Sequence, residues 1–424
     1  MRTFRAGDWG FLALLMLASC LNFLDRQIFS ILIPAMKAEL NLSDTELGAL
    51  SGLAFALFYS VLGVPIARLA DRTDRGRVLA AAVALWSAMT MLCAAVSGFW
   101  QLALARMMVG VGEAGGTPPS HALLAERFAP EQRSMAMSLV ALGVPLGILS
   151  GLLLGGFAAQ ALGWRWAFVL AGLPGLVLSP LLLYCVRDRR RFDGRWGGAD
   201  TDVGVVCTLR ALWSIASYRY LLVGAVLFAL SSYGLTQWLP SFLVRSHGFD
   251  IRGAGLVLAL LLGVVGGLGT FSGGLVADRL VKFDRRWAFW CPAVSIVLFA
   301  PCLVAAMLAS STSAFLLIAA IPVFLNFTTI GPTYAMVQQF AAPQQRAIAA
   351  AFTLLVINLF GLGVGPLAVG LIADLLSPKG ETDALRHAII IVSAGGGLLS
   401  GVAFLKAGRL LGRGEAGMAA LQRA

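Results

Sequence analysis

Four ionisable residues stand inside long apolar stretches in the first half of this 424-residue chain. Asp25 and Arg26 lie late in the apolar run that starts at Trp9, and Arg106 and Glu113 lie in a later run. Arg106 and Glu113 are seven residues apart, which is about two helical turns and places them on nearly the same helix face. Because ionisable groups are costly in a bilayer, these residues are the first candidates for chemistry.

Carboxyl and guanidinium groups together are suited to binding and releasing a proton. A carboxyl group in a low dielectric favours its neutral form, whereas a nearby Arg favours the ionised form. We therefore expect Asp25 and Glu113 to carry a proton, and Arg106 to sense their charge or to hold an anionic head group. From the helical rise, Asp25 and Arg106 reach a similar depth in a core about 30 Å thick, so they could form an ion pair or a network with Arg26. The competing interpretation is a fixed salt bridge that only locks two helices together.

The composition requires lipid as the solvent. Hydrophobic residues make up 59% of the chain and charged residues 12%, and the mean hydropathy is +0.85. Soluble chains carry roughly 25% charged residues. The net charge of +11 would point to nucleic acid in a soluble protein, but the basic residues here lie between apolar runs and do not alternate with aromatics. We expect no nucleic-acid partner, and since the six cysteines lack metal-ligand spacing, no metal.

Apolar runs of about 20 residues predict membrane-spanning helices. The first run is too long for a cleavable signal peptide and is taken as a span. We expect twelve spans, near residues 10–33, 46–67, 78–97, 101–124, 134–159, 165–186, 219–244, 253–277, 287–308, 313–338, 347–373 and 387–407.

The basic residues predict the topology. Most Arg and Lys fall in the even-numbered loops and tails, including 68–77 and 187–195, so both termini should be cytoplasmic. The stretch 187–218 is polar and reads as a cytoplasmic linker. The predicted organisation is an N-terminal six-helix half at 1–186, the linker, a C-terminal half at 219–408 and a cytoplasmic tail at 409–424.

The two halves repeat one another. The segment 68–72 after the second span matches 275–279 after the eighth, and 128–133 matches 340–346 after the tenth. The segment 143–147 in the fifth span resembles 363–367 in the eleventh. Repeated halves are typical of alternating-access carriers, whose substrate site lies near the midplane between them.

These motifs resemble the major facilitator superfamily. Its pattern after the second span is a Gly followed by Asp-Arg and a basic cluster. The second half keeps it, as Gly274 with Asp278 and Arg279, whereas the first half departs from it by having Ala67 in place of the Gly before 71–77. The segments 21–27, 42–44, 55–59 and 106–116 are more narrowly similar to the Spinster family. This resemblance implies an all-α fold of two pseudo-symmetric six-helix bundles. It also implies transport of lysolipids or sphingosine-phosphate-like amphiphiles, with proton coupling. The gating residues that it implies, as a latch between helix ends, are Asp71, Arg72, Arg75, Asp278 and Arg279.

Further polar and aromatic residues are candidates to line a substrate cavity. Some of the neutral groups are expected to contact substrate, while others only join helices. Phe55 and Tyr59 could give an apolar wall for an acyl chain, although packing against lipid or in the core is the favoured interpretation of each. The substrate-binding candidates are Arg26, Arg106, Glu113, Phe55, Tyr59, Thr117, Ser232, Tyr233, Gln237, Asn326, Thr329 and Asn358.

Other classes of function are less consistent with the sequence. Gly110, Gly112 and Gly115 match a dinucleotide fingerprint by letter, but no strand precedes them, and close helix packing explains them better. No P-loop or nucleophile–base arrangement appears, so we expect no enzyme and no cofactor. A receptor or scaffold would not need paired intramembrane charges. The remaining alternatives are a carrier of a soluble organic anion and a multidrug exporter. We expect a monomer in the bacterial inner membrane, with protons and membrane lipids as further partners.

Overall fold

The computed structural model describes residues 6–186, 205–337, 340, 346–377 and 383–411, and all regular structure among them is helical. The first helices are α1 (Ala6–Leu40), α2 (Asp44–Ser51), α3 (Leu53–Arg72), α4 (Arg75–Leu92), α5 (Phe99–Ala114), α6 (Thr117–Arg127), α7 (Pro130–Ala141), α8 (Gly143–Leu162) and α9 (Trp164–Cys185). The later ones are α11 (Val205–Ser214), α12 (Ala216–His247), α13 (Ile251–Leu258), α14 (Gly266–Leu280), α15 (Trp287–Met307), α16 (Thr312–Thr328), α17 (Ile330–Val337), α18 (Arg346–Val356), α19 (Gly363–Leu376), α20 (Ala384–Ile389) and α21 (Gly395–Arg409). Several helices continue through π-helical turns, at Ala259–Val265, Ile357–Leu362 and Ile390–Ala394.

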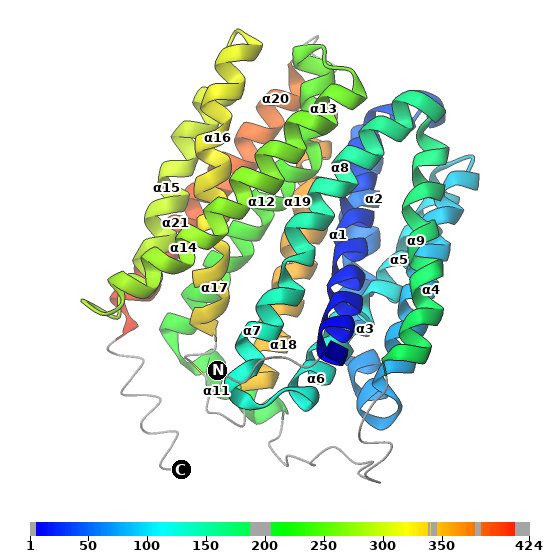
Figure 1. The fold of residues 1–424 in the computed structure, drawn as a ribbon. Helices are drawn as coiled ribbons and strands as arrows, with labels where there is room; N and C mark the ends of the chain where they lie inside the picture. The colour runs from blue at the N-terminus through cyan, green and yellow to red at the C-terminus, as the bar shows by residue number, and fades with distance from the viewer. Residues whose placement is uncertain (1–5, 187–204, 338–339, 341–345, 378–382, 412–424) are drawn as a thin grey trace. The chain divides into compact units, whose positions relative to one another are not determined.

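The helices form two compact units. One consists of Met1–Asp200 and Leu243–Gly263, and the other of Thr201–Phe242 and Val264–Ala424. In the first unit α1 lies along α8, and α4 lies along α9 (Figure 1). In the second unit α15 packs against α16 and α21. The predicted halves differ from these units at Leu243–Gly263, because the end of α12 and the whole of α13 pack with the first unit. Of the predicted linker, residues 187–204 lie outside the described residues, and α11 occupies part of the rest.

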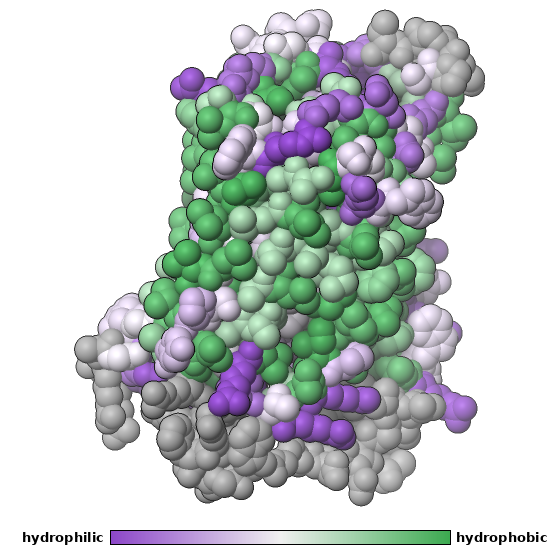
Figure 2. Space-filling view, turned by 90° about the vertical axis from the view of Figure 1, so that its right-hand side faces the viewer, coloured by the Kyte–Doolittle hydropathy of each residue, from purple (hydrophilic) through white to green (hydrophobic). Residues whose placement is uncertain are grey.

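The described helices have the length and composition of membrane spans. Eleven helical segments in this part of the chain are long and apolar enough to cross a bilayer. The predicted fourth span is divided into α5 and α6 at Gly115 and Gly116, so neither piece reaches that length alone. The side of the molecule that carries α4 and α9 is broadly apolar, with hydrophilic residues gathered at its two ends (Figure 2). The prediction of an all-α polytopic membrane protein is confirmed.

Local signals fix where some helices begin. Ser43 caps α2: its side chain accepts from the Glu46 backbone N–H while the Glu46 carboxylate accepts from the Ser43 backbone N–H. This reciprocal pair satisfies two donors that a helix start leaves unpaired. At the start of α4, the Asp74 side chain accepts from the backbone N–H of Arg77, without a reciprocal bond. These caps fix the starts of α2, which begins at Asp44, and of α4, which begins at Arg75.

Candidate functional site

The centre of the site is an ion pair between α1 and α5. Arg26 Nε donates to Glu113 Oε2 at 2.8 Å, and the two side chains are 12% and 0% exposed. The amide of Asn22, one turn before Arg26, also interacts with this carboxylate. A pair this deeply buried is stable only when its geometry and hydrogen bonds are good. The pair therefore holds α1 and α5 together for as long as Glu113 is ionised.

Aromatic rings surround the Arg26 guanidinium. Its Cζ lies 5.2 Å from the Phe23 ring centroid, 4.9 Å from that of Phe55 and 4.8 Å from that of Tyr59. The rings of Phe55 and Tyr59 are stacked at 5.4 Å. Cation–π contacts contribute about 2 kcal/mol when desolvated. The rings thus offset part of the free energy needed to bury Arg26.

Arg106 is also buried near Phe55. It is 2% exposed, and its Cζ lies 4.4 Å from the Phe29 ring centroid and 5.1 Å from that of Phe55. Its Nε reaches the carbonyl oxygen of Leu50 at 3.5 Å. Phe55 therefore contacts both arginines, and the predicted apolar wall residue is part of the charge network itself.

Asp25 is held by α4. Its Oδ2 accepts a hydrogen bond from Thr90 Oγ1 at 3.0 Å, and the residue is 2% exposed. Asp25 is within electrostatic range of Glu113 and Arg106, but among the described residues no ion pair joins it to Arg106. The Asp25–Arg106 ion pair was one possibility that the depth argument allowed, and the described structure has the Arg26–Glu113 ion pair instead. In this part of the chain Asp25 Oδ1 and Glu113 Oε1 have no hydrogen-bond partner, so each buried carboxyl has one oxygen free to carry a proton.

Glycines in α5 make the network possible. A Cβ on Gly110 would lie 2.6 Å from the Phe55 carbonyl oxygen, and one on Gly112 would lie 2.6 Å from the Trp86 backbone nitrogen. Neither contact is sterically allowed, so both positions require glycine for α3 and α4 to approach α5. This confirms close packing as the explanation of the glycine pattern.

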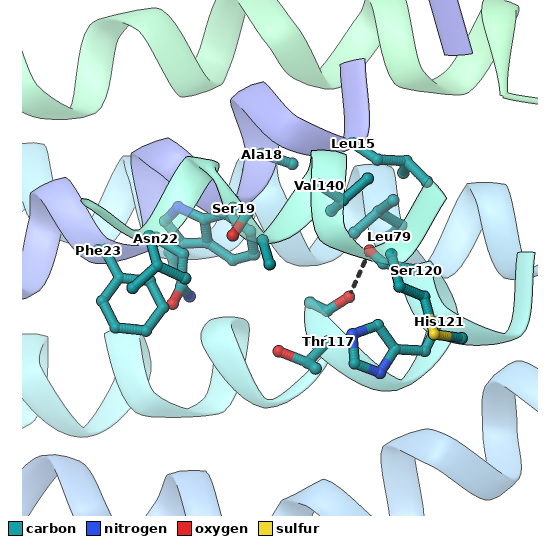
Figure 3. Close-up of a pocket in the computed structure, with 15 residues that line it drawn as sticks. Leu15, Ala18, Ser19, Asn22, Phe23, Leu79, Thr117, Ser120, His121 and Val140 are labelled. Carbon is teal, nitrogen blue, oxygen red and sulfur yellow. Dashed lines mark hydrogen bonds between the residues drawn. The ribbon is translucent and has the colours of Figure 1, made fainter. Parts of the chain in front are cut away.

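A cavity of about 240 Å³ lies beside the ion pair, within the first unit. Asn22 and Phe23, which contact Glu113 and Arg26, form part of its wall. Thr117, a predicted substrate-binding residue, lines it from α6 together with His121 (Figure 3). The site therefore joins a charged network to a space that is lined by polar and apolar groups.

The predicted polar residues of the second unit include a neutral hydrogen-bonded pair. Ser232 Oγ donates to Asn326 Oδ1 at 2.9 Å, joining α12 to α16, and Asn326 is 1% exposed. Thr329 is fully buried and donates to the Leu325 carbonyl oxygen at 3.3 Å. The other candidates lie on α12, as Tyr233 and Gln237, and in the π-helical turn after α18, as Asn358.

The predicted gating residues differ between the units. Arg75 pairs with Asp71 at 2.7 Å and with Glu126, which connects the start of α4 to α3 and α6. Arg72 ends α3 and is exposed. Asp278 and Arg279 are exposed near the end of α14 and form no ion pair within the described part of the chain. Among the described residues, ion pairs at these predicted gating positions are therefore found in the first unit and not in the second.

A second ion cluster, around Asp44, lies in the first unit at the end opposite to the Arg75 pairs. Asp44 accepts from Arg245 Nη1 and Nη2, each at 2.7 Å, and from Lys37 Nζ at 2.6 Å. Bidentate Arg–carboxylate pairs are strong and geometrically specific. The cluster fixes the end of α12 to α1 and α2.

Sequence reasoning missed several of these partners. Thr90, Phe23 and Phe29 carry no charge, and only their helix positions relative to the arginines would have pointed to them. Glu126 stands close to the segment 128–133 and Asp44 ends the segment 42–44, but Arg75 and Arg245, with which they pair, lie 51 and 201 residues away. Among the described residues, no group of three or more His, Cys, Asp or Glu side chains is arranged to hold a metal ion.

Comparisons with known proteins agree on one family. The model of the Major Facilitator Superfamily matches residues 15–366. An MFS-type efflux pump of Mycolicibacterium smegmatis is 34% identical over 399 residues, which cover 93% of this chain and 91% of the pump. A sphingosine-1-phosphate transporter of Danio rerio is 28% identical over 395 residues, covering 88% of this chain and 77% of its own. The crystal structure of a bacterial homolog of the human lysosomal transporter Spinster, inward-facing and unoccupied, has a TM-score of 0.80 and 25% identity and covers 98% of each chain.

Proposed function

The chain belongs to the Major Facilitator Superfamily and resembles its Spinster members, and we propose that it is a proton-coupled carrier of a lysolipid or sphingosine-phosphate-like amphiphile. The family assignment makes it a multi-pass membrane transporter and not an enzyme. The predicted fold and family resemblance are confirmed by these comparisons. The substrate class and the proton coupling are the proposal.

The observation that carries the proposal is the buried pair of carboxyls around two arginines. With all four groups ionised, Asp25, Arg26, Arg106 and Glu113 have no net charge. When Glu113 takes up a proton, Arg26 loses its counter-ion and becomes available to an anionic head group. Proton binding at Glu113 and substrate binding at Arg26 would then be linked, because both depend on the same guanidinium. The substrate would bind the protonated state of Glu113 with higher affinity than the ionised state, and such a difference in affinity is what coupling requires.

The remaining substrate candidates divide by chemistry. Phe55 and Tyr59 would shield the arginine from water and meet the apolar start of an acyl chain. Arg106, covered by Phe29 and Phe55, would act on the network through its charge and not by direct contact with substrate. Asp71, Arg72 and Arg75 would hold one end of the first unit during alternating access, and Asp278 and Arg279 would take the equivalent role in the second.

A transport assay tests this function. Purified protein in liposomes should move a lysolipid in response to an imposed proton gradient, and Asp25→Asn and Glu113→Gln should each abolish the dependence on that gradient. Thr236→Val, in α12, is a control that removes a polar group outside the network. If both carboxyl variants respond to the gradient as the wild type does, proton coupling at these residues is wrong.

A multidrug exporter is the second candidate, because the efflux pump covers nearly the whole chain at 34% identity. Substrate-dependent thermal stabilisation separates the two, with lysolipids, organic anions and cationic drugs tested side by side. Stabilisation by cationic drugs alone would favour the exporter, since an arginine site would repel them.

We also propose that the protein is a monomer in a bacterial inner membrane with both termini cytoplasmic. The asymmetric distribution of Arg and Lys supports this orientation. Reporter fusions at each terminus, active only in the cytoplasm, test it. Activity at one end only would contradict an even number of spans.

A further inference from the structure

The loop between α14 and α15 is longer than a reversal of the chain requires. In the first unit, Thr73 and Asp74 are sufficient to join α3 to α4. The corresponding loop of the second unit consists of the six residues 281–286. The two loops follow the repeated segments 68–72 and 275–279, so the additional residues belong to the second unit and need an explanation of their own.

This loop lies close to the membrane surface. Both helices that it joins belong to candidate membrane spans. Six residues reach at most about 10 Å from the two helix ends, because an extended chain spans about 3.5 Å per residue and must also return. The loop is folded back on α14, since the backbone N–H groups of Phe283 and Asp284 donate to the Leu280 carbonyl oxygen at 3.0 and 3.3 Å. Its side chains are therefore held near the depth of the lipid head groups, a layer about 6 Å thick on each face.

The loop exposes an aromatic side chain. Phe283 is 85% exposed, and an exposed phenylalanine ring keeps a large apolar area in contact with water. Trp287 and Trp290 follow at the start of α15, with their ring centroids 5.9 Å apart. Tryptophans are typical of the interface between membrane and water. These aromatic residues together indicate contact with lipid at this end of α14 and α15.

Basic side chains lie around the loop. Trp290 connects two groups of them: Arg286 Cζ lies 6.0 Å from its ring centroid, and a Cβ on Gly408 would lie 2.7 Å from its Nε1. The end of α21 is therefore beside the start of α15 (Figure 1). We call the exposed basic residues of these two helix ends and the loop the α14–α15 collar, which consists of Arg279, Lys282, Arg286, Lys406 and Arg409.

The collar directs positive charge outward. The exposed acidic residues on the same segment are Asp278 and Asp284, and Lys282 forms no ion pair within the described part of the chain. In the first unit, by contrast, Arg75 pairs with Asp71 at 2.7 Å and with Glu126. The distribution of basic residues between loops follows from membrane topology, but topology does not require an exposed phenylalanine among them.

We propose that the collar and Phe283 bind an anionic phospholipid of the surrounding membrane. Lys282 and Arg286 contact the phosphate of its head group, and Phe283 lies against the first carbons of its acyl chains. The positive charge favours an anionic lipid over a zwitterionic one, and the exposed ring favours a lipid over a soluble anion. The site would hold the second unit to its leaflet whatever substrate the protein carries.

Lipid binding to the full-length protein in detergent, measured by native mass spectrometry, tests the proposal. Phosphatidylglycerol should bind at least about 5-fold more tightly than phosphatidylcholine with the same acyl chains, since one basic side chain near an anionic lipid contributes about that factor. Lys282→Gln combined with Arg286→Gln should weaken phosphatidylglycerol by about 25-fold, the product of two such contributions, and leave phosphatidylcholine unchanged. Phe283→Ala should weaken both lipids.

Matched variants separate the site from general effects of charge and exposed rings. Arg68→Gln combined with Arg77→Gln removes two exposed charges from the first unit. Phe271→Ala removes a ring that is 70% exposed on α14. Neither change should alter the binding of phosphatidylglycerol. If the double collar variant does not fold, Lys282→Gln alone replaces it, with an expected weakening of about 5-fold.

Three results would overturn the proposal. Equal binding of the two lipids by the wild type would remove the argument from charge. Equal weakening by the collar variant and by the variant at Arg68 and Arg77 would show that only the total charge matters. Displacement of phosphatidylglycerol by inorganic phosphate would show a site for a soluble anion, in which Phe283 has no part.

Discussion

The Arg26–Glu113 pair gives the most direct measure of the charge network. Glu113→Gln removes the counter-ion of Arg26 and leaves a guanidinium that stays charged at any accessible pH. Its side chain is only 12% exposed, and breaking a buried pair from one side typically costs about 3–5 kcal/mol. Because three aromatic rings still contact the guanidinium, we expect a loss near the lower end, about 3 kcal/mol.

The opposite variant should be milder. Arg26→Gln leaves Glu113 buried, but this carboxyl can take up a proton and become neutral, so we expect a loss of about 1–3 kcal/mol. In the double variant neither charge remains unpaired. Its loss should fall short of the sum of the two single losses by about 0.5–3 kcal/mol, the range for residues in contact.

Equilibrium unfolding in mixed detergent micelles, followed over a titration with dodecyl sulfate, measures the free energy of unfolding for each variant. The Glu39–Arg165 pair is a control of the same chemistry, because its side chains are 51% and 38% exposed. Exposed pairs contribute about 0–1 kcal/mol, so removing it should change little. If the double variant at Arg26 and Glu113 loses the full sum of the single variants, the two residues do not stabilise each other and the network reasoning is wrong.

Four further changes test other parts of the structure. Asp44→Asn should weaken the cluster with Arg245 and Lys37 and lower the free energy of unfolding by about 1.5–3 kcal/mol. The control Asp250→Asn, at an exposed helix cap, should lower it by less than about 1 kcal/mol. Equal losses in the two variants would contradict a special role for Asp44. Gly110→Ala should lower the free energy of unfolding by about 1–3 kcal/mol, because the added methyl group overpacks against Phe55. Gly63→Ala is the control, since Gly63 has open space around it, and it should not destabilise the protein. Thermal unfolding of both variants checks this. Thr90→Val keeps its shape and loses the bond to Asp25, so the pH profile of transport should shift while the melting temperature moves little; an unchanged profile would separate Asp25 from coupling. Glu126→Gln should slow turnover with KM unchanged, and an altered KM instead would place Glu126 in substrate binding.

The spans could be predicted because lipid imposes a composition that soluble helices do not need. The apolar runs predicted the helices, and the charged residues inside those runs indicated the members of the network. The division of the fourth span at Gly115 and Gly116 was harder, since paired glycines in membrane helices also serve close packing. Whether a glycine pair interrupts a helix or allows close packing depends on the backbone of the neighbouring helices, which the sequence alone does not specify.

The pairing within the network could not be read from the sequence. Asp25 and Arg26 are adjacent, so a depth argument places both at the level of Arg106 and cannot separate them. Neighbouring residues point about 100° apart around a helix, and the choice between them depends on how α1 is rotated against α4 and α5. Packing fixes that rotation: α4 presents Thr90 to Asp25, while Arg26 is directed to Glu113. The Asp44–Arg245 contact is still less accessible, because its partners are 201 residues apart.

The buried polar groups described in the two units differ in charge. The network of α1, α3, α4 and α5 buries two carboxyls and two arginines, whereas the hydrogen-bonded pair described between α12 and α16 is neutral. A neutral amide cannot take up a proton in the physiological range, so Ser232 and Asn326 cannot store the energy of a proton gradient. Asn326 Nδ2 nevertheless lacks a partner among the described residues, which leaves it a donor for an uncharged acceptor. Under the proposed mechanism, Asn326→Leu should therefore change substrate affinity while the number of protons moved per substrate stays fixed, and a changed stoichiometry would show that coupling extends into the second unit.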